Sequence, residues 1–381
     1  MAAPDPARTP ADHPLPAFVP VATVRRGGLA ESHHFAAAAA VTPQGRIVAR
    51  LGDPDFATFA RSAVKPFQAL PLVEGGGVER FSLDAGDLAL ICASHAGRPE
   101  HAAAARSLLE RGGFSVADLG CGAHRPLGEE ARRMLEEAGG EATPLHNNCS
   151  GKHAGMLLAC RLFGWSHAGD GADSYLHPNH PLQRRIRRRV ALFSGLGEER
   201  LGVGIDGCSA PTFHMPLAAL ARCYAALVAP ELSPPVADAS ASGAAHGLAN
   251  GATGGDEEVG VAAAAGRVVD AMTSRPENVA GPGRFTTRLM QATRGRILGK
   301  EGAEGVYAIG VRGPVAMGVA LKIADGGERA RDGIVVHLLR LLGVLSAEEL
   351  DSLSDLVRPV VRNHRGLEVG EIVADFELER A

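Results

Sequence analysis

The amino-acid sequence predicts an α+β fold, in which an antiparallel sheet built from both ends of the chain carries a mainly helical insertion. Strand-like segments joined by short turns lie at 35–51 and again at 305–323. The stretch between them, about 66–290, repeats apolar residues at the three- and four-residue spacing of helices. Hairpins at both ends pair most simply into one antiparallel sheet, so we predict a single unit over 22–381.

Residues 1–21 are predicted to be a disordered lead-in. They combine prolines with Asp5 and Asp12 and lack the basic and apolar regions of a secretory signal. The six cysteines are spread along the chain rather than packed into a short secreted scaffold, so we expect them to be reduced and the protein to be cytoplasmic. The apolar runs are far shorter than the roughly 18 residues of a membrane helix, so no membrane association is predicted.

The segment 35–51 is predicted to be a β-hairpin. Its first arm contains five consecutive alanines, which by propensity favour a helix. The turn-forming residues at 42–45 and the partly alternating arm at 46–51 favour strands instead. The next segment should therefore lie at a junction from strand to helix.

That next segment contains Ser62 and Lys65 in an S-x-x-K pattern, with Pro66 after the lysine. A proline fits a helix only in its first turn, where the N–H groups have no intrahelical partner, so Ser62 is predicted at a helix start. Residues three apart share a helix face, so the Ser62 hydroxyl and the Lys65 amine can meet as a nucleophile and its base. The plainer interpretation is a helix-capping serine followed by a surface lysine.

The remaining elements follow from the same spacing rules. Helices are predicted at 100–111, 128–138, 152–163, 181–193, 216–228, 259–274 and 331–342. Strands are predicted at 305–311, 315–323 and 371–376. The range 237–255 is rich in Ala, Ser and Gly and nearly lacks large side chains, so we predict a flexible insertion, either a lid or a plain surface loop.

The charge of the chain argues against nucleic acid as a partner. The formal net charge is −4, whereas binding to a phosphate backbone needs a basic footprint. The arginine-rich run at 184–189 is therefore interpreted as the solvated face of a helix.

Three stretches combine glycine with small polar residues, as close backbone approach to a ligand requires. They are 92–97, 146–155 and 204–211. In the second, Cys149 and Lys152 stand three apart at a predicted helix start, where the pKa of a cysteine is lowered. Cys149 could then be a nucleophile, a metal ligand or a small buried residue. The sequence contains no paired C-x-x-C, no His-Glu-x-x-His and no G-x-x-x-x-G-K-[ST] phosphate loop.

Taken in order, five stretches of the chain resemble the Rhizobium-type L-asparaginase II family. They are 61–66, 92–95, 146–153, 206–211 and 299–305. The resemblance extends from about Val24 to Asp325 and is most specific in the Asn-Asn-Cys-Ser-Gly-Lys-His block that starts at Asn147. It implies a fold like that of serine β-lactamases and glutaminases, which agrees with the sheet predicted above.

The resemblance implies hydrolysis of L-asparagine to L-aspartate and ammonia by two serine–lysine pairs. Ser62 with Lys65 matches the first pair, and Ser94 with Lys300 matches the second. Lys322, on a predicted strand, is the other lysine that could serve Ser94. The sequence leaves open which serine attacks the amide carbon and whether glutamine is excluded. The family also implies a homodimer.

The resemblance further implies a zinc ion held by Cys149, Lys152 and Cys208. Lysine is an uncommon zinc ligand because its amine must be neutral, so we expect metal binding to weaken as the pH falls. Three protein ligands would leave one position open, as in catalytic zinc sites.

Two other functions stay open on the sequence. In one, the Cys149 thiolate is the nucleophile of an amidohydrolase, with His146 or His153 as its base. In the other, the chain is a non-catalytic relative that binds asparagine without releasing ammonia. An enzyme of the first kind would keep its activity when Ser62 is replaced by alanine.

Overall fold

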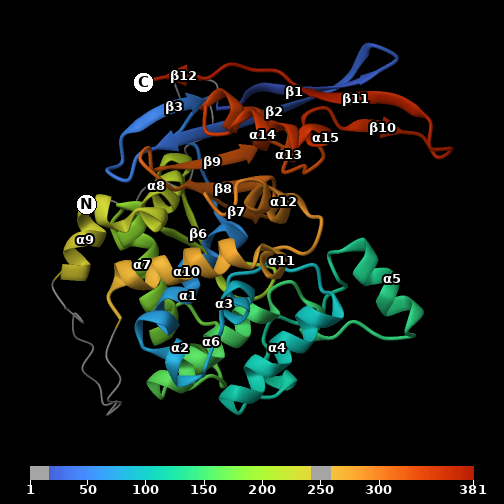
Figure 1. Cartoon of the computed structure of the whole chain (residues 1–381). Helices are drawn as coiled ribbons and strands as arrows, with labels where there is room; N and C mark the ends of the chain where they lie inside the picture. Colours follow the sequence, from blue (N-terminus) through green and yellow to red (C-terminus); the bar gives the residue numbers. More distant parts are fainter. Residues whose placement is uncertain (1–16, 242–258) are drawn as a thin grey trace.

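A computed structural model describes residues 17–241 and 259–381 of the chain. Its main sheet, drawn at the top of Figure 1, consists of β1 (Val19–Arg26), β2 (Leu29–Val41), β3 (Ile47–Leu51), β7 (Ile297–Gly302), β8 (Val306–Val311), β9 (Met317–Ile323), β10 (Val360–Arg362), β11 (Glu368–Ala374) and β12 (Glu379–Arg380). The strand order is β10-β11-β1-β2-β9-β8-β7, with β3 paired to β2 and β12 paired to β3. β7 is therefore an edge strand.

Both ends of the chain meet in this sheet. β2 pairs with β9, β1 with β11 and β3 with β12, and every one of these pairings is antiparallel. The prediction of an antiparallel sheet built from both chain ends is confirmed. The strands predicted within 35–51 and 305–323 and at 371–376 are present, with shifted boundaries.

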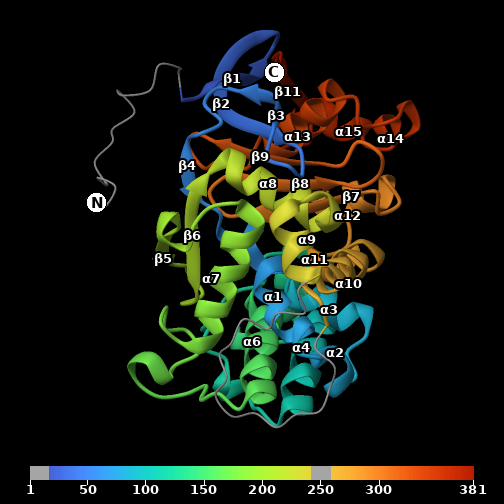
Figure 2. The same ribbon diagram turned by 90° about the vertical axis from the view of Figure 1, so that its left-hand side faces the viewer.

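Most helices lie on one side of the main sheet, and the view in Figure 2 shows the same separation. The helices are α1 (Lys65–Glu74), α2 (Gly77–Arg80), α3 (Ala85–Ile91), α4 (Pro99–Gly112), α5 (Glu129–Glu137), α6 (Ser150–Phe163), α7 (Pro181–Ser194), α8 (Leu217–Val228), α9 (Pro234–Ala241), α10 (Val261–Ser274), α11 (Pro276–Val279), α12 (Phe285–Ala292), α13 (Arg331–Leu341), α14 (Ala347–Asp351) and α15 (Ser354–Val357). A small second sheet contains β4 (Ala57–Phe59), β5 (Gly202–Ile205) and β6 (Pro211–Pro216), in the order β4-β6-β5.

The two faces of the main sheet bury separate cores. Odd-numbered residues of 37–41 in β2 face the larger core, which the helical region fills, and even-numbered residues of 36–40 face a second core that includes α12 and α13. Each alanine of this run is at most 3% exposed. The alanines form a strand because burial against partners on both faces outweighs their helical propensity.

The N-terminal boundary differs from the prediction. β1 begins at Val19, so residues 19–21, which were assigned to the lead-in, belong to the sheet. Val21 is fully buried, and its carbonyl accepts a hydrogen bond from the Asp375 N–H. This strand is specified by its pairing with distant β11, which a local pattern does not reveal. Residues 1–16 of the predicted lead-in lie outside the described residues.

The predicted insertion and helical region also need correction. Residues 237–241 form the end of α9 rather than the start of a flexible insertion, and residues 242–255 of that insertion lie outside the described residues. β5 and β6 interrupt the helical region with a pair of short strands. The helices predicted from spacing are present, each within two residues, as α4, α5, α6, α7, α8, α10 and α13. In the ranges that the structure describes, no helix has the length and apolar character needed to cross a bilayer.

Candidate active site

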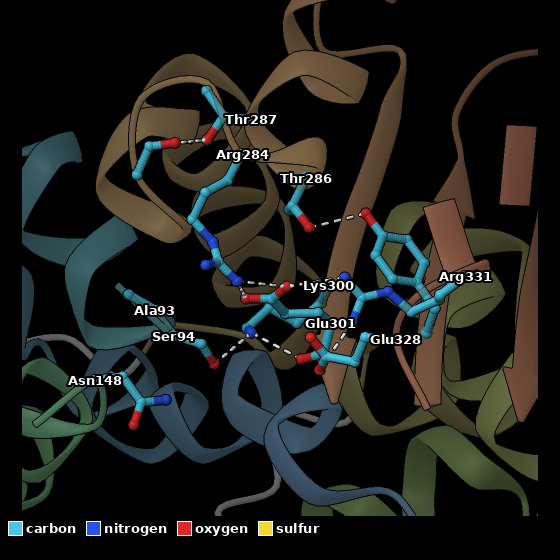
Figure 3. Close-up of polar contacts among 12 residues, drawn as sticks. Ala93, Ser94, Asn148, Arg284, Thr286, Thr287, Lys300, Glu301, Glu328 and Arg331 are labelled. Carbon is cyan, nitrogen blue, oxygen red and sulfur yellow. Dashed lines mark hydrogen bonds and ion pairs between the residues drawn. The ribbon is translucent and has the colours of Figure 1, made fainter. Parts of the chain in front are cut away.

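Ser94 lies between two buried lysines, one of which, Lys300, is shown with it in Figure 3. The Ser94 Oγ is 3.0 Å from Lys65 Nζ and 2.7 Å from Lys300 Nζ. The Lys65 amine also donates to Ala93 O at 2.6 Å and to Asn148 O at 3.5 Å. Ser94 and both lysines are at most 3% exposed. A continuous hydrogen-bonded chain therefore joins Lys65, Ser94 and Lys300.

The members of this chain come from three separate elements. Lys65 is the first residue of α1, Ser94 follows the end of α3, and Lys300 projects from the edge strand β7. Pro66 lies in the first turn of α1, as predicted. The Ser94 N–H donates to Val279 O at 2.9 Å, which fixes the serine backbone.

Ser62 occupies a 3₁₀ turn at 61–64, directly before α1. Ser62 is 9% exposed, against 3% for Ser94. The predicted hydrogen bond between Ser62 and Lys65 is not formed among the described residues, because the Lys65 amine turns to Ala93 O, Asn148 O and Ser94 Oγ instead. Ser62 therefore lies in the turn before Lys65 but is not a member of the hydrogen-bonded chain of Lys65, Ser94 and Lys300.

Arg61 holds the turn that presents Ser62. Its backbone has a φ of +50°, in the left-handed region, which costs a non-glycine residue about 1–3 kcal/mol and is concentrated at functional sites. Its side chain forms an ion pair with Asp206, with 2.8 Å between Nη2 and Oδ1. Although burial opposes the charged form of Asp206, the Arg61 guanidinium lowers the pKa of this carboxyl. Asp206, which belongs to the 204–211 stretch, thus anchors the turn that carries Ser62.

The two lysines considered for Ser94 have different partners. Lys300 reaches Ser94, whereas Lys322 Nζ donates to Glu304 O at 2.6 Å and to Ile323 O at 2.7 Å. Burial, followed by the positive charge of Lys65, lowers the pKa of Lys300 to about 7. A neutral Lys300 amine is thus populated near neutral pH, as a proton acceptor requires.

The start of α6 brings the 146–155 stretch to the same place. A Cβ added to Gly151 would lie 2.3 Å from Leu90 O, so only glycine allows α6 to approach the end of α3 this closely. This approach places the Asn148 carbonyl against the Lys65 amine. The 92–97 and 146–155 stretches therefore converge on one buried site.

Cys149, Lys152 and Cys208 form a second buried cluster, in which each residue is at most 5% exposed. Lys152 Nζ lies 2.7 Å from Cys208 Sγ. A hydrogen bond from Cys208, with the Lys65 and Lys152 amines nearby, holds the pKa of Cys149 well below its ordinary value. Burial opposes the charged form of Lys152, but the two sulfurs raise its pKa above the ordinary value.

Two of these three side chains, Cys149 and Cys208, offer the sulfur donors that zinc prefers, and the amine of Lys152 can join them as a nitrogen donor only when it is neutral. Cysteine thiolates and nitrogen are common zinc ligands, and the lowered pKa of Cys149 favours its thiolate. Within residues 17–241 and 259–381, no three His, Cys, Asp or Glu side chains are arranged to hold a metal ion. Lys152 is therefore needed to complete the predicted set with Cys149 and Cys208.

His146 and His153 have partners other than Cys149. His146 Nδ1 accepts from the Thr143 N–H at 3.0 Å, and His153 Nδ1 lies 2.7 Å from Tyr175 Oη. In the part of the chain that the structure describes, neither histidine forms a hydrogen bond with the Cys149 sulfur. The geometry thus offers Cys149 no histidine base.

Sequence reasoning missed the Arg61–Asp206 ion pair and one compositional signal. The chain has only four lysines among its 39 basic residues. All four are at most 8% exposed, and they are Lys65, Lys152, Lys300 and Lys322. Exposed cations in the described residues are arginines, so lysine itself was the signal of an interior role.

A buried serine that contacts two lysines, at the junction of a helical region and an antiparallel sheet, is typical of α+β hydrolases that transfer acyl groups. The chain belongs to the L-asparaginase II family, whose model matches residues 22–374. The family predicted from the motifs is confirmed, and membership supports amidohydrolase activity.

Two solved structures of Mglu show a distant likeness to the chain. The crystal structure of Mglu in its native form is 16% identical, with a TM-score of 0.40 over 83% of this chain and 66% of that chain. Mglu in its native form in the presence of 4.3M NaCl is 17% identical, with a TM-score of 0.34 over 87% of this chain and 66% of that chain. The chain thus spans slightly less than two thirds of these Mglu chains. No curated protein matches it.

Proposed function

We propose that the protein is an L-asparagine amidohydrolase that releases L-aspartate and ammonia. The observation that supports this most strongly is the hydrogen-bonded chain of Lys65, Ser94 and Lys300, with Ser62 in the turn that directly precedes Lys65. Family membership supports hydrolysis of an amide. The same proposal includes three further points: asparagine as the substrate, a fold like that of serine β-lactamases and glutaminases, and a homodimeric state.

Ser62 is the proposed nucleophile. It is more exposed than Ser94, whose hydroxyl already contacts two amines. Ser62 and Lys65 share one turn, so a rotation of the lysine side chain would bring its amine to the Ser62 hydroxyl when substrate binds. Catalytic hydrogen bonds are often long in a free enzyme and form only in the complex.

The chain of Lys65, Ser94 and Lys300 supplies the proton route. As Ser62 Oγ attacks the side-chain amide carbon, its proton passes to Lys65, and Lys65 gives up a proton through Ser94 to the neutral Lys300 amine. When the C–N bond breaks, the leaving nitrogen takes a proton back through Ser94 and departs as ammonia. Water then hydrolyses the aspartyl ester, which releases L-aspartate and restores Ser62.

The direct test of this function is product formation by the purified full-length chain. With L-asparagine we expect ammonia and L-aspartate in equal amounts, and a parallel assay with L-glutamine measures selectivity. Binding of L-asparagine without release of ammonia would support a non-catalytic relative instead. Light scattering of the same preparation tests the homodimer.

The activity should depend on pH through Lys300. Because the proton acceptor must be neutral and the pKa of Lys300 is about 7, we expect kcat/KM for asparagine to rise with pH along a limb centred at about 7 and then level off. Initial rates of ammonia release between pH 5 and 9 measure this limb. A profile that stays flat through this range would contradict a role for neutral Lys300.

We propose that a zinc ion is bound by Cys149, Lys152 and Cys208. A zinc ion bound there would supply Lewis acidity beside the serines or brace the walls of the site. We expect about one zinc ion per chain after gel filtration, and loss of that zinc in Cys208→Ser, measured by elemental mass spectrometry. The control is Cys160→Ser, a buried cysteine of α6 outside the cluster. Equal zinc contents in the two variants would overturn the assignment.

The lowered pKa of Cys149 supports one competing function, in which its thiolate attacks the amide. Cys149→Ala separates the two proposals, since a cysteine nucleophile cannot be replaced by alanine without loss of turnover. We expect Cys149→Ala to affect zinc content first and to retain more activity than Ser62→Ala.

A further inference from the structure

We propose that Arg284 is a positioning residue for the Ser94–Lys300 pair. Through its ion pair with Glu301, it ties the 279–284 loop to β7, which carries Lys300. This loop begins with Val279, the last residue of α11, whose carbonyl accepts a hydrogen bond from the Ser94 N–H. This inference rests on the function proposed above and extends it to a residue outside the hydrogen-bonded chain.

Ser94 is held by the 279–284 loop. Its N–H donates to Val279 O at 2.9 Å, and a Cβ added to Gly281 would lie 2.7 Å from the Ala96 side chain. Gly281 also has a φ of +129°, which side chains rarely adopt, so glycine is required there on both grounds. The backbone around Ser94 and this loop are therefore in direct contact.

Lys300 is held through its neighbour in the sequence. Its amine donates to Glu301 O at 2.9 Å, in addition to its contact with Ser94. The position of the Glu301 backbone thus decides where the Lys300 amine lies. Because side chains alternate along a strand, the Glu301 carboxylate points to the other face of β7, away from the serine.

Arg284 joins the two halves, as Figure 3 shows. It precedes the first residue of α12, and its Nη2 donates to both Glu301 carboxylate oxygens, at 2.8 and 3.0 Å. Arg331 lies on the far side of the same carboxylate, 3.5 Å from Glu301 Oε2 and over the Tyr307 ring. Glu301 therefore sits between two guanidinium groups and is fixed in place.

Among the described residues, one donor of the Arg284 side chain is left without an acceptor. Its Nε is buried and has no hydrogen-bond partner in the described part of the chain. A buried donor without an acceptor typically costs about 1–3 kcal/mol. Because this cost reduces stability, we infer that the position of Arg284 serves the Ser94–Lys300 pair.

Arg284 also acts on Lys300 through its charge. The groups that face the Lys300 amine are Lys65 of α1, Cys92 and Ser94 after α3, Cys149 at the start of α6, Arg284 and Glu301. Burial and Lys65 lower the pKa of Lys300 most, Glu301 and Cys149 raise it, and Arg284 lowers it further. Loss of the Arg284 charge should therefore raise the pKa of Lys300 and reduce the fraction of neutral amine.

The test compares Arg284→Met, Arg284→Lys and, as a matched control, Arg288→Met in the full-length protein. Arg288 lies one turn further along, within α12, and pairs with Asp355 at the surface. We expect Arg284→Met to lower kcat for ammonia release about 10- to 100-fold, as small misplacements of reacting groups do. Its pH limb should move to higher pH, Arg284→Lys should return the limb toward the wild type, and Arg288→Met should match the wild type in both.

Because the chain has only four lysines, NMR of ¹³C-labelled lysine follows the titration of Lys300 without any substrate. A titration that moves to higher pH in Arg284→Met supports the proposal, even if the wild type releases no ammonia and the proposed function fails. An unmoved titration overturns it, including when kcat falls, because a merely structural loss would leave the titration in place. If Arg284→Met does not fold, Arg284→Gln, which keeps a donor for Glu301 but not the charge, carries the same expectation.

Discussion

Ser62→Ala should abolish the release of ammonia from L-asparagine, with a fall in kcat of roughly 10⁴- to 10⁶-fold, as for other catalytic serines. The reason is chemical, since alanine has no oxygen with which to form the aspartyl ester. The substitution removes one hydroxyl from a residue that is 9% exposed, so the thermal midpoint should change little. Ammonia release by a coupled assay, beside thermal melting, measures both.

The control for this variant is Ser166→Ala. Ser166 lies in an exposed loop, where its Oγ donates to Ala168 O, so the control should keep wild-type activity. A Ser62→Ala enzyme that retains most of its kcat would contradict the proposed nucleophile and favour the Cys149 alternative.

Lys300→Met should have the next largest effect, a fall in kcat of about 10²- to 10⁴-fold, which is the usual contribution of a general base. Methionine fills a similar volume in a fully buried position but accepts no proton. The limb of the pH profile centred at about 7 should disappear from the residual activity, because the group whose pKa is about 7 is gone. Steady-state kinetics across pH measure both effects.

The stability of Lys300→Met should rise relative to the wild type. The pKa of Lys300 is about 7 in the folded chain and 10.5 ordinarily. Between these two pH values, the Lys300 amine is protonated in the unfolded chain and neutral in the folded chain. Lys300 therefore lowers the free energy of unfolding at any pH below its ordinary pKa, and this loss of stability shrinks as the pH rises between the two pKa values. The control is Lys322→Met, which replaces a lysine whose amine donates to the backbone carbonyls of Glu304 and Ile323, and it should keep the pH limb. A Lys300→Met variant with a wild-type pH profile would assign the limb to another group.

The sheet and the helices could be predicted where the local pattern carried the information. α4, α7 and α13 show the spacing of helices, and the segment 35–51 has a turn followed by a partly alternating arm. β7 was missed because its six residues include two glycines, a lysine and a glutamate, which read as a loop. All six are buried in the structure, so the polar residues that conceal the strand are the ones that serve the site.

The site could be predicted in its members but not in its connections. A sequence shows which residues share one turn of a helix, and so it pairs Ser62 with Lys65. The Lys65 amine instead contacts Ser94, 29 positions away, because α1 and the end of α3 pack together. The Arg284–Glu301 ion pair depends in the same way on where α12 meets β7, which no local spacing encodes.

In the proposed mechanism, Ser62 forms an acyl ester with the substrate, and the hydrogen-bonded chain of Lys65, Ser94 and Lys300 moves the protons. The most direct measurement is mass spectrometry of peptides from the enzyme quenched during turnover of L-asparagine. The account predicts an added aspartyl group on the peptide that contains Ser62, and its absence when Ser62→Ala is treated in the same way. An aspartyl group on the peptide that contains Ser94 or Cys149 would contradict the account.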